Sequence, residues 1–73
     1  MNAKQAVAVR IQELCKERGI TVNTLANMAG TSPSTIYSML NTKSQNPGVV
    51  SLQKICDGLE ISIRDFFNDD LFD

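Results

Sequence analysis

The stretch from Thr21 to Asn41, TVNTLANMAGTSPSTIYSMLN, decides the fold of this chain of 73 residues. Its first half predicts a short helix over about 22–28. Thr21 precedes that helix with a hydroxyl that can cap free N–H groups. Gly30 follows it, where a residue free to take positive φ can end a helix and turn the chain. The apolar residues spaced to form one inner stripe are Leu25, Ala26 and Ala29.

The second half of the stretch predicts another short helix. Ser32 and Pro33 mark its start, because a capping hydroxyl is followed by a proline at the first helical position. Its inner face would consist of Ile36, Met39 and Leu40. Two short helices joined by a tight turn form an arrangement in which one helix can be presented to a groove.

A longer helix is expected before this pair. It would begin at Asn2 or Ala3, where Asn2 and Gln5 have the spacing of a capping pair, and it would stop at Gly19. Its buried face would carry Val7, Ile11 and Leu14. Its charged residues are expected on the outside, where they keep the helix soluble; they are Arg10, Glu13, Lys16, Glu17 and Arg18.

Two helices are expected after the pair, beyond a polar loop at 41–48. The first runs over about 49–59, and Gly58 inside it suggests a close contact with another helix. A capping box at 62–65 opens the second. The residues expected to be buried are Val49 or Val50, Leu52, Ile55, Cys56, Leu59, Ile63, Phe66 and Phe67.

This layout resembles that of the Cro/phage-repressor (XRE-type) helix-turn-helix family of DNA-binding regulators. Within the central stretch the resemblance rests on Ala26 at the helix contact, Gly30 in the turn, and Ile36 and Met39 in the second helix. Outside it, the matching residues are Ile11, Gln12, Glu13, Leu14, Gly19, Ile20, Thr21, Asn46, Pro47, Ile55, Leu59, Ile61, Phe66 and Phe67. The resemblance covers about residues 7–67 and implies a compact, all-α, five-helix fold with a central helix-turn-helix.

Length and composition agree with a small folded protein. The chain has room for a single domain over 1–73, whose last six residues, 68–73, form a short acidic tail. Apolar residues make up 42% of the chain, which favours folding over disorder. The sequence has neither an apolar run long enough to span a membrane nor the apolar segment of a signal peptide, so we expect a cytoplasmic protein without membrane contacts.

Charge is distributed unevenly along the chain. The net charge of −1 is unusual for a DNA-binding domain, since such domains are generally basic. However, residues 1–56 carry six basic and two acidic side chains, whereas residues 57–73 carry one basic and six acidic ones. No acidic residue lies between Val22 and Ile55. The surroundings of the helix-turn-helix are therefore mildly basic.

The sequence gives little support for catalysis or for a cofactor. Cys15 and Cys56 lie far apart and the chain has no His, so the usual zinc ligand sets are missing and both thiols are expected to be buried and reduced. No Ser or Cys stands next to a plausible base, and there is no glycine-rich phosphate loop. Three acidic residues of the tail, Asp69, Asp70 and Asp73, are expected to be solvated rather than to bind a metal. We expect no enzyme.

The resemblance implies that the second helix of the pair, over 32–41, enters the major groove of double-stranded DNA. The residues expected to face the groove are Ser32, Pro33, Ser34, Tyr37, Ser38 and Asn41. Serine hydroxyls can bond several base edges, and the Tyr37 ring can contact a thymine methyl group or a phosphate. Phosphate contacts are expected from Thr21, Asn23, Thr24, Lys43 and Ser44. Two alternatives stay open: Ser32 acts purely as a helix cap, and Tyr37 is an ordinary surface ring.

Three departures from the family leave a second function open. Relatives tend to have Gln at the position of Val22, Gln or Arg at that of Pro33, and a basic residue near that of Ser38. They also often carry glycine where Thr42 and Glu60 stand. The main hypothesis is a sequence-specific transcriptional regulator. The alternative is a protein-interaction module that has kept the fold and lost DNA binding.

A homodimer is expected, because one short helix reads few base pairs and two half-sites multiply the affinity. All three Phe residues fall within the last eight residues of the chain. Exposed apolar clusters tend to mark contacts, so Phe67, Leu71 and Phe72 are predicted to mediate self-association. The alternative is that Leu71 and Phe72 fold back on the first helix.

Overall fold

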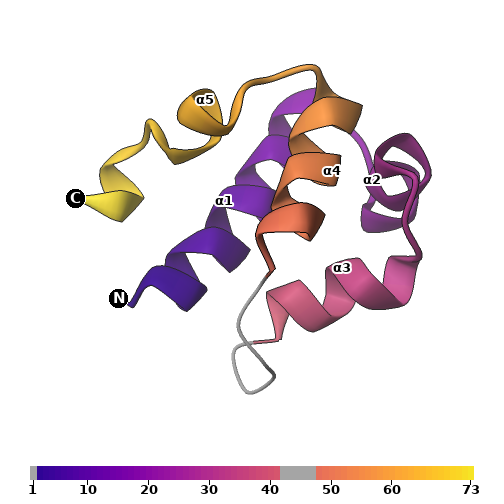
Figure 1. Cartoon of the computed structure of the whole chain (residues 1–73), viewed down its shortest axis with the longest axis horizontal. Helices are drawn as coiled ribbons and strands as arrows, with labels where there is room; N and C mark the ends of the chain where they lie inside the picture. Colours follow the sequence, from indigo (N-terminus) through magenta and orange to yellow (C-terminus); the bar gives the residue numbers. More distant parts are fainter. Residues whose placement is uncertain (1, 42–47) are drawn as a thin grey trace.

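The computed structural model describes residues 2–41 and 48–73, and within these ranges the chain is helical and has no strand (Figure 1). Its elements are α1 (Ala3–Arg18), α2 (Val22–Ala29), α3 (Pro33–Leu40), α4 (Val49–Leu59), α5 (Ile63–Phe67) and a short 3₁₀ helix, η1 (Asp70–Phe72). The expected all-α fold of five helices is confirmed. The described chain adds η1, in a tail that is too short for an α-helix.

Helix starts follow the local sequence signals. Asn2 accepts a hydrogen bond from the Gln5 amide at 2.8 Å, and its own amide donates to the Gln5 side chain at 3.0 Å, which completes the predicted capping box. Ser62 caps α5 by accepting a hydrogen bond from the Asp65 amide at 2.9 Å. Each bond satisfies a first-turn N–H group that has no partner inside its helix.

The ends of α1, α2 and α4 share one geometry. Each helix is followed by a residue in the left-handed region: Gly19 with φ of 62°, Gly30 with φ of 68°, and Glu60 with φ of 58°. The N–H of the next residue donates to the carbonyl five positions back, at 3.0 Å in all three cases. Glycine adopts this conformation without strain, whereas Glu60 holds it at a cost of about 1–2 kcal/mol.

The core collects apolar side chains from all five helices. Ile11, Leu25, Ile36, Ile55 and Phe66 each have 0% exposed surface. Cys15 and Cys56 are buried in the same cluster, as expected. Burying this apolar surface is the main source of stability for a domain of this size.

The expected burial is wrong for the first turn of α4 and for two residues of α5. Val49 and Val50 are 71% and 67% exposed, because the first turn of α4 projects beyond the core and Leu52 is its first buried residue. Ile63 and Phe67 retain 41% and 38% exposed surface. Because α5 has only five residues, it packs on one face and places Phe66 inside.

A close contact between α4 and α2 confirms the role expected for Gly58. A Cβ atom added at Gly58 in α4 would lie 2.7 Å from both the carbonyl carbon and the carbonyl oxygen of Met28, and 2.8 Å from the Ala29 nitrogen. All three are backbone atoms of α2, so they cannot rotate away as a side chain would. The two helices therefore meet backbone to backbone at this point.

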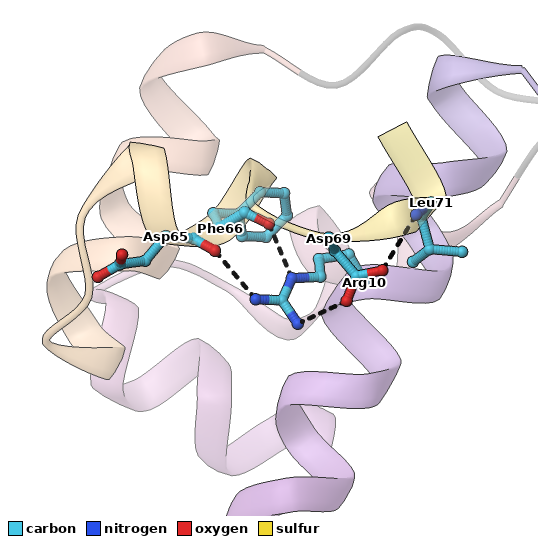
Figure 2. Close-up of polar contacts among 5 residues, drawn as sticks. All are labelled: Arg10, Asp65, Phe66, Asp69 and Leu71. Carbon is cyan, nitrogen blue, oxygen red and sulfur yellow. Dashed lines mark hydrogen bonds and ion pairs between the residues drawn. The ribbon is translucent and has the colours of Figure 1, made fainter. Parts of the chain in front are cut away.

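Arg10 departs from its expected place on the outer surface. Its side chain is 11% exposed and reaches the C-terminal end of the chain (Figure 2). Nε donates to the Phe66 carbonyl at 2.7 Å, a terminal nitrogen donates to the Asp65 carbonyl at 3.0 Å, and the other lies 3.5 Å from an Asp69 carboxylate oxygen. A cation is thus placed on two carbonyls at the end of α5, where the helix dipole favours positive charge.

The C-terminal tail folds back on the first helix, which was the alternative to an exposed tail. The Asp69 carboxylate accepts a hydrogen bond from the Leu71 amide at 3.0 Å and so starts η1, as Figure 2 shows. Phe72 packs against the core, with its ring centroid 4.8 Å from that of Phe67 and 6.2 Å from that of Phe66. η1 contacts α1, so the tail covers part of that helix.

We expect Gly58→Ala to destabilise the protein. In an open helix the same change stabilises by about 1 kcal/mol, but here the added methyl group meets the backbone of α2, and overpacking of this kind costs about 1–3 kcal/mol. The matched control is Gly48→Ala, since a Cβ atom at Gly48 would meet nothing within 4 Å. Urea denaturation followed by circular dichroism measures both changes. Equal stability of the two variants would contradict the close contact.

Arg10→Met is expected to cost about 1.5–3 kcal/mol, because it keeps the length of the side chain but removes the charged donor from the part-buried Phe66 carbonyl and from the Asp65 carbonyl. Arg64→Met is the control, since Arg64 is exposed in the same part of the molecule. Denaturation midpoints report the effect. If both variants unfold at the same denaturant concentration, Arg10 does not hold the C-terminal end.

Candidate nucleic-acid interface

The turn between α2 and α3 is built from buried contacts and from backbone geometry. Ala26 has no exposed surface and belongs to α2, which contacts α3, so we expect a larger side chain at this position to overpack the core. Gly30 supplies the positive φ at the end of α2, and the Thr31 amide donates to the Ala26 carbonyl at 3.0 Å. These features fix the direction in which α3 leaves the turn.

The inner face of α3 is anchored in the core and its other face is open. Ile36 and Met39 are 0% and 5% exposed. Pro33, Ser34, Tyr37 and Ser38 are exposed, and Tyr37 in the middle of the helix retains 55% of its surface. Because successive helical residues are about 100° apart, anchoring positions 36 and 39 turns positions 34, 37 and 38 outward.

Ser32 is the N-cap of α3. Its hydroxyl accepts a hydrogen bond from the Thr35 amide at 3.3 Å and lies 3.0 Å from the Thr35 hydroxyl. Pro33 occupies the first turn of the helix, as predicted. The capping role proposed as the alternative for Ser32 is therefore present, and it positions the exposed start of the helix.

The start of α2 has a similar cap. Thr21 accepts a hydrogen bond from the Thr24 amide at 3.1 Å, and the two hydroxyls lie 3.1 Å apart. Thr21, Asn23 and Thr24 are all exposed. Val22, at a position where relatives tend to carry a contacting Gln, is instead partly buried and packs against the core. At this position the chain thus has a packing contact rather than a polar side chain.

The far end of the predicted site is described only in part. α3 ends at Leu40, one residue earlier than expected, and Asn41 is its exposed C-cap. Lys43 and Ser44, which were predicted to contact phosphates, lie outside the described residues.

Four of the eight acidic residues belong to α5 and the C-terminal end: Asp65, Asp69, Asp70 and Asp73. Figure 1 shows α5 and the C-terminal end at the upper left of the molecule, with α3 at the lower right. Between Gly19 and Cys56 the sequence has no acidic residue, so no carboxylate from α2, α3 or their turn faces an approaching polyanion. A chain with a net charge of −1 thus carries no charged side chain on α2, on α3 or in the turn between them.

The thiols have the properties of packed core groups. Burial raises the pKa of the Cys15 thiol. Burial, together with the neighbouring negative charge of Asp57, raises that of Cys56. Both groups therefore stay protonated at neutral pH, and the thiolate needed for nucleophilic attack is scarce. In the described part of the chain, no three metal-ligating side chains gather into a possible metal site.

Comparison with known proteins agrees with this geometry. The crystal structure of the prophage Lp1 protein 11 is similar to this chain, with a TM-score of 0.87 and 29% sequence identity over 99% of this chain and 95% of that one. No curated protein sequence matches the chain. Among the described residues, no helix is both long and apolar enough to cross a membrane.

The family model that describes Cro/C1-type helix-turn-helix DNA-binding domains matches residues 10–70. This range begins with Arg10 in α1 and runs through α2, the turn, α3 and α4 into η1. The chain belongs to the family of Cro/C1-type helix-turn-helix DNA-binding domains.

Proposed function

We propose that this protein is a sequence-specific transcriptional regulator that places α3 in the major groove of DNA. The observation that carries the proposal is the open face of α3, where polar side chains surround an exposed Tyr37 while Ile36 and Met39 anchor the opposite face. Membership in the Cro/C1-type family supports DNA as the ligand. A rigidly held helix with an open polar face is what groove reading requires.

Base contacts in this proposal come from small polar groups and one ring. The hydroxyls of Ser34 and Ser38 donate to or accept from base edges, and the Tyr37 ring packs against a thymine methyl group. Pro33 adds contact surface at the start of the helix, and Asn41 follows at its end. Specificity of this kind depends on hydroxyls and on DNA shape rather than on bidentate arginine contacts.

Phosphate contacts position the domain on the duplex. Thr21, Asn23 and Thr24 lie at the N-terminus of α2, where free amides and the helix dipole favour an anion. The Ser32 hydroxyl is engaged in the α3 cap, so its part is to hold the helix start in place. Lys43 and Ser44 are proposed, from the sequence, to contact the backbone beyond α3.

Two copies of the chain are proposed to bind together. Half-sites in such complexes lie about 34–36 Å apart, one helical turn of DNA. The longest extent of this protein is 29 Å, so two copies fit side by side on adjacent half-sites. The sequence predicted self-association through Phe67, Leu71 and Phe72, but the proposed pairing on DNA does not require contact through these residues.

A salt titration tests the DNA proposal. Each phosphate neutralised by a cation adds about 0.9 to the slope of log affinity against log salt concentration. Because few cations flank α3, we expect a shallow but measurable slope on mixed-sequence duplex, and tighter binding to a duplex selected from a random pool. A chain that binds no duplex even at low salt would instead be a protein-interaction module of the same fold.

Substitutions at Tyr37 and Lys43 are expected to weaken DNA binding in different ways. Tyr37→Ala should cost about 1–3 kcal/mol on the selected duplex and little on random duplex, because it removes a base contact. Lys43→Ala should weaken binding to all sequences alike and lower the salt slope by about one unit. Tyr37→Phe is the matched control that keeps the ring.

Fluorescence anisotropy of labelled duplexes provides both measurements, and circular dichroism checks that helicity is unchanged. If Tyr37→Ala binds the selected duplex as tightly as the parent, α3 does not read the groove through this residue.

A further inference from the structure

Four apolar residues of α5 and η1 remain at least partly exposed, and Figure 1 shows these two elements on the side of the molecule away from α3. We define the aromatic patch as Ile63, Phe67, Leu71 and Phe72. Ile63 and Phe67 are four residues apart on α5 and so share a face, with 41% and 38% exposed surface. Leu71 and Phe72 belong to η1 and are half-buried.

The patch is held in a defined shape. The Phe67 ring stands edge-on to Phe66 at a centroid distance of 5.0 Å and edge-on to Phe72 at 4.8 Å. Arg10 holds the backbone under these rings through the carbonyls of Asp65 and Phe66 and through Asp69 (Figure 2). A partner that binds such a surface has little ordering entropy to overcome, because the rings are already in place.

Exposed carboxylates stand next to the patch residues along the chain, and we call them the acidic rim. Asp70 and Asp73 stand directly before Leu71 and directly after Phe72, and both are exposed. Asp65 is exposed on α5. The nearby positive charge of Arg10 is directed into the structure, where it binds Asp69 and two carbonyl groups. Residues 57–73 carry a single basic side chain, Arg64, against six acidic ones.

We propose that the aromatic patch is a docking surface for a protein segment that combines apolar side chains with lysine or arginine, such as a basic amphipathic helix. The apolar side chains of the segment cover Phe67 and Ile63, and its cations meet the carboxylates of Asp70 and Asp73. A second copy of this chain related by a two-fold axis fits less well, because it brings the same acidic rim against itself. The acidic rim also repels nucleic acid.

A partner bound at the aromatic patch can be held at the same time as a ligand of α3. α3 and the aromatic patch lie at opposite sides of the molecule, so a partner bound at the patch leaves the open face of α3 accessible. The inference does not depend on what α3 binds.

The experiment uses the full chain and two synthetic peptides of about five helical turns. One carries leucines on one face and lysines on the other, and its twin carries glutamates in place of the lysines. Titration calorimetry is expected to show binding of the lysine peptide and none of the glutamate peptide. The affinity should fall with salt, because the rim charges are exposed.

Paired variants locate the binding site. The double variant Asp70→Asn/Asp73→Asn removes two rim charges and should weaken binding of the lysine peptide about three- to tenfold. Its matched control, Glu17→Gln/Asp57→Asn, removes two exposed acidic charges on α1 and α4 and should leave the affinity unchanged. Thermal melting confirms that all four changes leave the protein folded, since these side chains are exposed.

Three results would overturn the proposal: equal binding of both peptides, equal weakening by the two double variants, or no binding of the lysine peptide. Sedimentation of the chain alone adds a fourth. If the chain sediments as a dimer that Phe67→Ser dissociates, while Val50→Ser at another exposed apolar position does not, a second copy covers the patch.

Discussion

The backbone contact between α4 and α2 at Gly58 is the constraint on which the arrangement of the other helices depends. With no side chain at this position, α4 approaches the Met28 carbonyl so closely that a Cβ atom would lie 2.7 Å from it. α2 is thereby held against α4 just before its end, and Gly30 then sets the direction of the turn. The outward direction of α3 follows from these two positions, although neither glycine belongs to the proposed DNA surface.

Much of the helix layout could be predicted from the sequence because its signals are local. A capping residue and the amide that it accepts from are three positions apart, so Asn2, Thr21, Ser32 and Ser62 each fix a helix start without help from the rest of the chain. Gly19 and Gly30 similarly mark helix ends. The predicted and observed ends of the helices agree within about one residue.

The predictions that were wrong concern residues whose burial depends on contacts between distant parts of the chain. Arg10 belongs to the same helix as the exposed Glu17 and Arg18, and only the fold brings it to the Phe66 carbonyl, 56 positions later. Val49 and Val50 fit the apolar pattern of α4, yet no other element covers its first turn. For the site, periodicity was sufficient to predict that Ser34, Tyr37 and Ser38 face outward, since Ile36 fixes the phase of the helix. The caps formed by the Thr21 and Ser32 hydroxyls were predicted as well, since each residue stands three positions before the amide that it accepts from.

The tyrosine and the phenylalanines of this protein lie in different parts of the molecule, so the fluorescence of each reports on a different side. The chain has no Trp and a single Tyr, so its intrinsic ultraviolet fluorescence above the weak phenylalanine signal comes from Tyr37 alone. That ring is 55% exposed in the middle of α3, whereas all three Phe rings lie at the C-terminal end. A ligand that covers α3 would change the tyrosine emission directly, and one that covers the C-terminal rings would leave it almost unaltered. Tyrosine fluorescence therefore reports binding at α3 without an attached dye.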